Sequence, residues 1–335
     1  MWKAVRINAV SYPVEPEIAE LEKAGVALTQ IEGQQPSEII AAAADCDALL
    51  VVSSKILAEV INAMPRCRII ARLGAGTDKI DIEAATAAGI VVSNVPDFCL
   101  SEQAEHTLML LLAFARRLPY MTRAMRIGEW TARNHQDVHR IAGRTLGLVG
   151  FGASAQAVAE RARPFGLRLL AWTRSPDKYR AIADRLSVEL RDLDDLLRES
   201  DFVSIHLPLN PETNHLLDER RIGLMKSNAV LINTARGAIV DEAALVRALK
   251  EKRIGGAALD VFEGIDVFAL PGTPAQHELL KLDNVILTPH CAGSSVESTH
   301  ESRRRGAASV VDVLSGKWPR HIVNPQVQPR FPLLK

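Results

Sequence analysis

One stretch of this sequence that could do chemistry is GLVGFGASAQAVAERA, residues 147–162. It follows an apolar run and opens a helical pattern, the setting in which a GxGxxG/A motif carries meaning. Its three small positions are Gly150, Gly152 and Ala155. The first permits a tight turn, the second lets a pyrophosphate approach the backbone, and the third lets helix and strand pack closely. The amides of Ala153 and Ser154 then face the anion at the positive end of the helix. The motif predicts a dinucleotide site, with a glycine turn of an ordinary α/β protein as the alternative.

A second informative stretch, LLAWTRSPDK, ends the next expected strand. An NAD-binding site normally offers a carboxylate to the ribose 2′-hydroxyl at this place, but here Thr173 stands there. Arg174 and Ser175 follow, with Lys178 close behind, and these groups could bind a 2′-phosphate through charge-assisted hydrogen bonds. We therefore expect NADP(H) to be favoured over NAD(H). The alternative is a solvated arginine on a loop.

A third stretch, LDVFEGIDVF, holds the carboxylates of Asp260, Glu263 and Asp266, and a histidine, His290, follows in the motif TPH. An imidazole exchanges protons near neutral pH, and a carboxylate beside it fixes its tautomer and orientation. The residues alone leave open which of these acids, if any, works with His290.

These candidates sit among short apolar runs that alternate with helical patterns, which indicates parallel sheets with crossover helices. A first series of expected strands covers residues 3–10, 48–53, 67–73 and 89–95. A second series covers residues 145–150, 167–173, 201–207, 229–235, 255–262 and 284–290. Six strands in this order are typical of a doubly wound dinucleotide fold.

Two longer helices are expected to connect these series. One covers SEQAEHTLMLLLAFARRL, with Ser101 as its plausible cap. The other runs from about Ser295 to Leu314 and would return the chain to the first series. Its basic run, residues 303–305, is expected on a solvated face.

The composition argues against several classes of protein. The chain has 40 basic and 40 acidic side chains, so no net charge draws it to nucleic acid or to an anionic membrane. Its four cysteines form no CxxC pair, and His135 and His139 lack an HExxH frame, so we expect neither a disulfide framework nor a metal site. The amino terminus lacks the regions of a signal peptide, and residues 108–115 are too few to span a bilayer. We expect a cytoplasmic protein with a small-molecule partner.

With these residues in view, the chain resembles the D-isomer-specific 2-hydroxyacid dehydrogenases, a family that includes glyoxylate/hydroxypyruvate reductases and D-3-phosphoglycerate dehydrogenases. The ordered motifs that carry the resemblance are ARLGAGTDKID (71–81), QAEHTLMLLLAFARR (103–117), GLVGFGASA (147–155), HLPLNPETNHLL (206–217), LINTARGAIVDEAAL (231–245), AALDVFE (257–263) and TPHCAGSS (288–295). The resemblance implies an α/β fold with two Rossmann-like or flavodoxin-like domains built on doubly wound parallel sheets. A substrate-binding domain, residues 1–100 plus 294–335, would receive the dinucleotide-binding domain, residues 101–293, as an insertion.

The resemblance also implies roles for single residues. Arg236 would grip the substrate carboxylate and polarise the carbonyl, and His290 would exchange a proton with the carbonyl oxygen as hydride moves. A structural loop arginine and a core histidine are the plainer alternatives. Further substrate contacts are expected at Leu73, Gly74, Ala75, Gly76 and Gln103. Further cofactor contacts are expected at His206, Pro208, Thr213, Thr234 and Asp260.

One position departs from the family pattern DVFxxE. The glutamate that partners the catalytic histidine is expected five residues after the aspartate, and Ile265 stands there. A one-residue shift would give this role to Asp266, whereas Glu263 is expected to point elsewhere.

Two functions follow from this resemblance. The first is an NAD(P)-dependent reductase of a small 2-ketoacid of the glyoxylate or hydroxypyruvate type. The second is a cofactor-sensing, corepressor-like scaffold on the same fold, which is considered because Ile265 replaces the catalytic glutamate of the family. A homodimer is expected from the resemblance and from the apolar helix at residues 104–115, whose exposed face would need covering.

Overall fold

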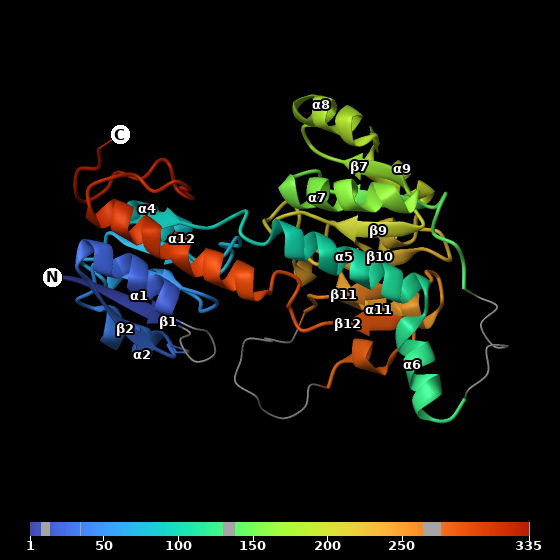
Figure 1. The fold of residues 1–335 in the computed structure, drawn as a ribbon, viewed down its shortest axis with the longest axis horizontal. Coiled ribbons are helices and arrows are strands. Elements are labelled where there is room, and N and C mark those ends of the chain that lie inside the picture. The colour runs from blue at the N-terminus through green and yellow to red at the C-terminus, as the bar shows by residue number, and fades with distance from the viewer. Residues whose placement is uncertain (8–13, 34, 130–137, 264–275, 335) are drawn as a thin grey trace. The chain divides into compact units, whose positions relative to one another are not determined.

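The structure, a computed structural model, describes residues 1–7, 14–33, 35–129, 138–263 and 276–334 (Figure 1). The chain divides into two compact units, Met1–Phe98 with Ser295–Lys335, and Cys99–Ser294. Each is an α/β unit built on a parallel sheet, as the alternating apolar runs predict. Within the described ranges, no helix is both long and apolar enough to cross a membrane. Within the described residues, none of the four cysteines forms a disulfide.

The first unit contains a parallel five-stranded sheet in the order β2-β1-β3-β4-β5. Its strands are β1 (Trp2–Ile7), β2 (Val26–Ile31), β3 (Ala48–Val51), β4 (Ile69–Arg72) and β5 (Val91–Ser93). Four of them match the expected runs, although residues 8–10 of the first run lie outside the described residues. The sequence did not predict β2, because this strand lies at the sheet edge and most of its side chains are exposed or half-buried.

Helices cover both faces of this sheet. On one face, α1 (Glu15–Leu21) and α12 (Val296–Leu314) lie side by side and share a core with the strands. On the other face lie α2 (Pro36–Ala43), α3 (Ala58–Asn62) and α4 (Ile82–Ala87). The start of α12 agrees with the expected one, because Ser295 caps it by accepting a hydrogen bond from the Ser298 amide.

The basic run of α12 is solvated only in part: Arg304 is exposed as expected, but Arg303 is not. Arg303 is only 3% exposed and lies near the buried carboxylate of Glu17 on α1, with Arg6 of β1 also beside that carboxylate. The prediction was wrong for Arg303 because α12 packs against both α1 and β4, so one arginine of the run faces inward. A run of charged residues is fully solvent-exposed only when the exposed face of the helix is wide enough to include every residue of the run.

The second unit contains a parallel seven-stranded sheet in the order β12-β11-β10-β9-β6-β7-β8. Its strands are β6 (Thr145–Val149), β7 (Arg168–Trp172), β8 (Val188–Leu190), β9 (Phe202–Ile205), β10 (Val230–Asn233), β11 (Gly256–Leu259) and β12 (Val285–Leu287). The sequence missed β8, a short edge strand in which only Val188 is buried, so it leaves no apolar run. With β8 included, the order is that of a doubly wound dinucleotide fold, extended by one further strand.

Helices again cover both faces. One face carries α5 (Leu100–Ala115), α7 (Ala153–Ala162) and α8 (Pro176–Leu186), and α5 and α7 lie side by side (Figure 1). The other face carries α9 (Leu193–Glu199), α10 (Glu219–Ile222) and α11 (Glu242–Lys250). A further helix, α6 (Leu118–Arg126), follows α5. The expected cap of α5 was wrong: the helix begins at Leu100, and the Ser101 hydroxyl instead accepts a hydrogen bond from Arg161.

Candidate active site

The residues predicted to do chemistry in the second unit follow the carboxyl ends of its strands. Parallel strands place these ends along one edge of the sheet, which is where open α/β sheets bind ligands. The residues are Gly150 after β6, Thr173 after β7, His206 after β9, Arg236 after β10, Asp260 after β11 and His290 after β12. Because β10, β11 and β12 are neighbours, the loops of Arg236, Asp260 and His290 lie next to one another.

The glycine motif has the backbone that its sequence requires. Gly150 has φ +99°, and a Cβ there would lie 2.5 Å from the carbonyl oxygen of His206. Gly152 is the residue before α7, and a Cβ there would meet no atom within 4 Å. Ala155 is fully buried. The open space at Gly152, in front of the first amides of α7, fits the pyrophosphate of a dinucleotide.

His206 lies beside this turn and is held by two hydroxyl groups. Its Nδ1 is 2.9 Å from the Ser154 hydroxyl, and its Nε2 is 2.9 Å from the Ser204 hydroxyl. Burial lowers the pKa of His206 to about 4, so the ring is neutral near pH 7. A neutral ring donates from one nitrogen and accepts at the other, which matches one hydroxyl partner on each side.

The loop after His206 forms a rigid turn. The buried Thr213 hydroxyl donates to the Pro208 carbonyl at 2.7 Å and accepts from the Asn210 amide at 2.9 Å. The Asn210 side chain in turn accepts hydrogen bonds from the amides of Glu212 and Thr213. Backbone and side chains therefore fix the position of Glu212.

At the end of β7, Arg174 forms an ion pair with Glu212. The side chains are 60% and 69% exposed. Thr173 accepts a weak hydrogen bond from the Ser175 amide at 3.3 Å, and Ser175 precedes α8. Lys178 lies on α8, with its ammonium 5.2 Å from the centre of the Tyr179 ring. Arg174, the cation expected here, is thus at the surface. It is paired with Glu212, a carboxylate that the sequence analysis did not identify as part of the site.

Arg236 follows β10 in a turn built by Asn233. The Asn233 side chain donates to the carbonyl of Arg236 at 2.9 Å and accepts from the amide of Ala235 at 3.0 Å. The turn is also tight, since a Cβ at Gly237 would lie 2.6 Å from the backbone of Phe262. Helix α5 supports the same turn.

Gln103 and Thr107 provide that support. The Gln103 amide donates to the Thr234 carbonyl at 3.1 Å, and the hydroxyls of Thr107 and Thr234 are 3.2 Å apart. Both Gln103 and Thr234, predicted as substrate and cofactor contacts, therefore make hydrogen bonds within this unit, directly before Arg236.

Asp260 organises the loop that carries His290. Its Oδ1 accepts from the Thr288 hydroxyl at 2.5 Å and from the Cys291 amide at 3.0 Å, while Oδ2 accepts from the Ala292 amide at 2.8 Å. The His290 amide donates to the Asp260 carbonyl at 2.9 Å, and His290 has a left-handed φ of +54°. A non-glycine residue with positive φ is uncommon, and the surrounding hydrogen bonds hold it in this conformation.

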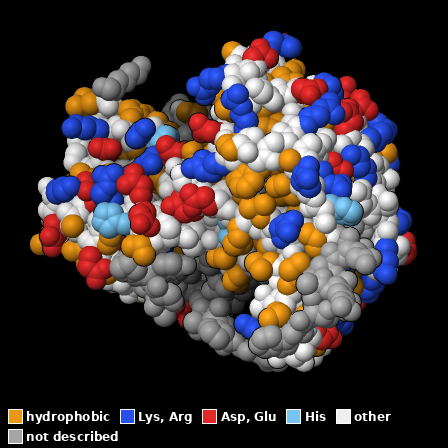
Figure 2. Space-filling view, turned by 45° about the vertical axis from the view of Figure 1, so that its right-hand side comes forward, with side chains coloured by type: hydrophobic (Ala, Val, Ile, Leu, Met, Phe, Trp, Pro, Cys, Tyr) orange, Lys and Arg blue, Asp and Glu red, His pale blue; other side chains and the backbone are white. Residues whose placement is uncertain are grey.

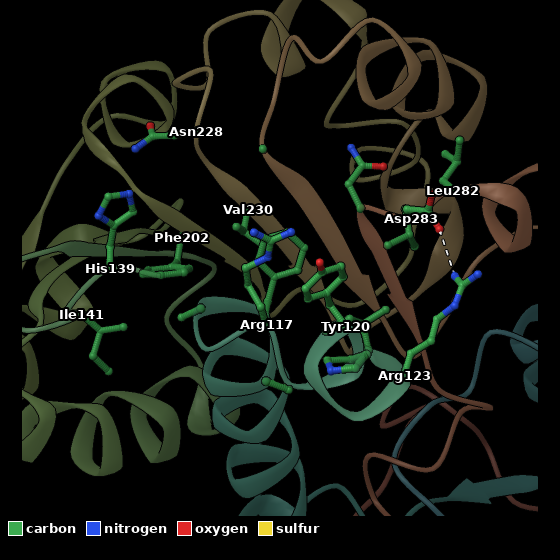
Figure 3. A pocket seen from close by; sticks show the side chains of 18 of the residues that line it. Arg117, Tyr120, Arg123, His139, Ile141, Phe202, Asn228, Val230, Leu282 and Asp283 are labelled. Atoms are coloured by element: carbon green, nitrogen blue, oxygen red, sulfur yellow. Dashed lines mark ion pairs between the residues drawn. The ribbon is translucent and has the colours of Figure 1, made fainter. Parts of the chain in front are cut away.

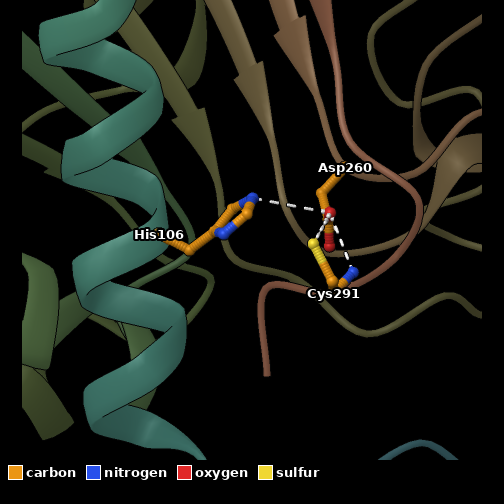
Figure 4. A group of neighbouring side chains, drawn as sticks. All are labelled: His106, Asp260 and Cys291. Atoms are coloured by element: carbon orange, nitrogen blue, oxygen red, sulfur yellow. Dashed lines mark hydrogen bonds and ion pairs between the residues drawn. The ribbon is translucent and has the colours of Figure 1, made fainter. Parts of the chain in front are cut away.

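His106 of α5 joins this network, and sequence reasoning did not single it out (Figure 4). Its Nε2 is 2.9 Å from the Thr288 hydroxyl and 3.5 Å from Asp260 Oδ1. Because Thr288 gives its only hydroxyl proton to Asp260, it must accept from Nε2–H of His106, which fixes the tautomer. The spacing of Gln103 and His106, one helical turn apart on α5, was the signal that could have identified it.

His106, Asp260 and Cys291 also bring three potential metal ligands within 4.8 Å of one another (Figure 4). Hydrogen bonds explain this cluster without an ion. Both lone pairs of Asp260 Oδ1 accept protons, from Thr288 and from the Cys291 amide. Burial, followed by the effect of Asp260, raises the pKa of the Cys291 thiol, so this group keeps its proton.

Glu263 lies with a different histidine. Its carboxylate is 3.1 Å from His215 Nε2, and its backbone amide donates to the carboxylate of Glu242 at 2.6 Å. Ile265 and Asp266 lie outside the described residues, so the partner of His290 stays a prediction.

In the first unit, the loop Leu73–Gly76 follows β4 and uses its carbonyl groups internally. The carbonyls of Gly74, Ala75 and Gly76 accept from the Val95 amide, the Asn94 side chain and Arg72 Nε, at 3.0, 2.7 and 2.9 Å respectively. Among the described residues, the amides of these same three residues donate no hydrogen bond to another backbone group. The loop therefore offers donors, as a site for a carboxylate must.

A cavity of the second unit lies elsewhere (Figure 3). It has a volume of about 970 Å³ and is lined by the starts of β9, β10 and β12 and by α6. Figure 3 shows Arg117, Tyr120 and Arg123 reaching into it, with Arg123 3.7 Å from the carboxylate of Asp283. Because it borders the amino ends of the strands, it is on the opposite edge from the glycine motif and cannot hold the dinucleotide.

Comparisons with known proteins bear on this site. Residues 108–292 match the family model described as D-isomer specific 2-hydroxyacid dehydrogenase, NAD binding domain. A glyoxylate reductase of Korarchaeum cryptofilum is 42% identical over 299 residues, which are 86% of each chain. A D-3-phosphoglycerate dehydrogenase of Methanocaldococcus jannaschii is 37% identical over 310 residues, 92% of this chain but only 56% of that longer protein.

Solved structures with the same fold bind either cofactor. An acyclic imino acid reductase in complex with NADPH and D-Arg has a TM-score of 0.86 at 27% identity, over 96% of this chain and 99% of that one. A D-lactate dehydrogenase from Aquifex aeolicus, complexed with NAD and lactic acid, has a TM-score of 0.84 at 27% identity, with the same coverage.

Proposed function

Because the chain belongs to the D-isomer-specific 2-hydroxyacid dehydrogenase family, we propose that it reduces a small 2-ketoacid of the glyoxylate or hydroxypyruvate type. The observation that carries this proposal is the edge of the second sheet, where Arg236 and the His290 loop follow strands β10 and β12 on either side of Asp260. A guanidinium, an imidazole and an anchored loop at one edge are the groups that carbonyl reduction requires.

The glycine turn supplies the place for the dinucleotide. Gly150, Gly152 and the amides of Ala153 and Ser154 would hold its pyrophosphate, and His206, Pro208, Thr213, Thr234 and Asp260 would border the nicotinamide half. The nicotinamide cofactor supplies the hydride when bound. His206 is neutral near pH 7 and contributes no charge of its own to this part of the site.

Arg236 and His290 then act on the substrate. The permanently charged, planar guanidinium binds the carboxylate and draws electron density from the neighbouring carbonyl. His290 donates a proton to the carbonyl oxygen during reduction and removes it in the reverse direction. The amides of Gly74, Ala75 and Gly76 would bind the carboxylate as well, with Leu73 and Gln103 as further contacts.

The preferred cofactor is proposed to be NADP(H). Thr173, Arg174 and Ser175 support this, because they place a cation and hydroxyl groups where an NAD-specific site has a carboxylate. A cytoplasmic location belongs to the same proposal and is supported by the four cysteines, none of which forms a disulfide within the described residues.

The protein is further proposed to be a homodimer assembled through the second unit. Hydrophobic side chains gather in a patch amid charged ones in Figure 2, and α6 and its end expose Leu118, Tyr120, Met125 and Ile127. Helix α5, the helix expected to need covering, exposes Met109 and buries Ala104, Leu108, Leu110 and Leu111 within its own unit, while its other apolar side chains are half-buried. Sedimentation that shows only monomer at micromolar concentration would contradict this proposal.

The experiment that tests the activity is a spectrophotometric assay of the purified protein with NADPH or NADH and a panel of 2-ketoacids. Oxidation of the cofactor with glyoxylate or hydroxypyruvate is the expected result. Tight cofactor binding without oxidation by any 2-ketoacid would favour the corepressor-like scaffold instead.

A further inference from the structure

The ion pair between Arg174 and Glu212 joins two loops on either side of the dinucleotide motif. Arg174 follows β7, Glu212 lies on the loop after β9, and β6 lies between these strands in the sheet. A bridge between the outer loops therefore passes in front of the glycine turn that follows β6. The Gly150 amide donates to the Trp172 carbonyl at 3.0 Å, and the His206 amide donates to the Val149 carbonyl at 2.8 Å, so both loops are anchored to this turn.

From this arrangement we propose that Glu212 determines cofactor choice by opposing Arg174. The proposal rests on the proposed function only in assuming that the adenosine ribose lies near the end of β7. Glu212 would accept a hydrogen bond from the ribose 2′-hydroxyl of NAD(H), in place of the carboxylate that the chain lacks at Thr173. Arg174 binds the 2′-phosphate of NADP(H), and Glu212 weakens that binding by repulsion.

The physical basis is the difference between the two ligands. A phosphate monoester carries nearly two negative charges at pH 7, so a neighbouring carboxylate repels it and a guanidinium attracts it. A hydroxyl is neutral and donates to a carboxylate. Either cofactor must open the ion pair, but exposed pairs of this kind are weak and open readily.

The two side chains are well supported for such a role. The Asn210 side chain accepts from the amides of Glu212 and Thr213, so the Glu212 backbone is fixed. Arg174 comes two residues after the last residue of β7 and two before α8. Neither group depends on the ion pair for its backbone position, so substitutions at either place should leave the fold intact.

The test uses two measurements on the full chain. The first is calorimetric binding of adenosine 2′,5′-bisphosphate and of adenosine 5′-monophosphate, and the second is kcat/KM with NADPH and with NADH. The variants are Glu212→Gln, which keeps the shape and removes the charge, and Arg174→Ala. Glu219→Gln is the matched control, because Glu219 is also an exposed carboxylate paired with an arginine, Arg247.

Glu212→Gln should strengthen binding of the bisphosphate relative to the monophosphate, and raise the NADPH-to-NADH ratio of kcat/KM, by roughly threefold or more. Arg174→Ala should lower both ratios by roughly ten- to a hundredfold. Glu219→Gln should change neither. Ratios for Glu212→Gln that remain those of the unmodified protein would overturn the proposal. If no 2-ketoacid is reduced but the binding ratios shift as expected, the proposed function fails while the role of Glu212 stands.

Discussion

Thr288 donates a hydrogen bond to Asp260 Oδ1 at 2.5 Å, which ties the residue after β12 to the residue after β11. The same carboxylate accepts hydrogen bonds from the amides of Cys291 and Ala292. Residues on both sides of His290 in the chain are therefore hydrogen-bonded to the Asp260 side chain. Asp260 is thereby a positioning residue for His290. His106 extends the network to helix α5 through Thr288.

Asp260→Asn should lower both stability and turnover. In asparagine one carboxylate oxygen is replaced by an NH2 group, which cannot accept a hydrogen bond. At least one of the loop's donors therefore loses its acceptor, at a cost of about 1 to 3 kcal/mol in the free energy of unfolding. Urea unfolding and kcat for 2-ketoacid reduction measure the two effects. Thr288→Val removes the hydroxyl bonds to Asp260 and His106 but keeps the two backbone amide bonds to the Asp260 carboxylate, so it should have the smaller effect. An Asp260→Asn protein with unchanged unfolding free energy and kcat would show that the loop does not need this carboxylate.

Substitutions at the two motif glycines should separate folding from cofactor binding. Gly152 has the extended conformation of a helix cap and open space around it, so Gly152→Ser should hold or raise stability, by up to about 1 kcal/mol. The new side chain fills the pyrophosphate site, so cofactor affinity should fall at least tenfold. Gly150→Ala, with φ +99° and a backbone contact, should destabilise the protein by more than about 1 kcal/mol. Denaturation and cofactor titration test both, and equal stability losses would contradict the distinction.

Stability should fall as the solution is acidified from pH 7 to pH 5, in part because of His206. Its pKa is about 4 in the folded protein and near 6.5 when unfolded, so the unfolded chain binds the proton first. The contribution of His206 to the free energy of unfolding is therefore fully present above pH 6.5 and is lost as the pH falls toward 4, with about 2 kcal/mol lost by pH 5. His206→Asn should flatten the dependence of unfolding free energy on pH, whereas the exposed His300→Asn should not. Parallel curves for His206→Asn and the unmodified protein would contradict the assignment.

Arg236→Lys should reduce kcat/KM for the 2-ketoacid at least about a hundredfold, equivalent to about 3 kcal/mol, because a lysine cannot form the two-pronged contact with a carboxylate. Cofactor affinity should stay within about threefold of that of the unmodified protein. Arg220→Lys, at an exposed ion pair with Asp194, is the control and should keep full activity. Similar kcat/KM values for Arg236→Lys and the control would exclude the proposed role of Arg236.

Asp266→Asn and Glu263→Gln test which acid partners His290. A carboxylate beside an imidazole raises the pKa of the histidine, and reduction needs His290 protonated. Asp266→Asn should therefore lower kcat for reduction and move the basic limb of its pH profile toward acid. Glu263→Gln should leave that limb in place, because Glu263 contacts His215. An unchanged profile for Asp266→Asn would show that His290 acts alone or with another acid.

Much of the fold and many of the site residues could be predicted from local patterns. Apolar runs, the glycine motif and the cap of α12 depend on residues close together in the chain, so their physics is visible in a short window. The same patterns placed Gly150 and His290 at the ends of expected strands and Arg236 directly after one, and the strand order then showed that all three lie at one edge of the sheet. The edge strands β2 and β8 were missed because half-exposed or very short strands leave little apolar periodicity.

The contacts of these residues depended instead on the order of strands and the packing of helices. Glu212 meets Arg174 across 38 positions of the chain, and His106 meets Thr288 across 182 positions. Arg303 is buried rather than solvated because α1 and β4 enclose its helix. A side chain's hydrogen-bond partners and solvent exposure depend on which distant segments fold against it, and no short stretch of sequence contains that information.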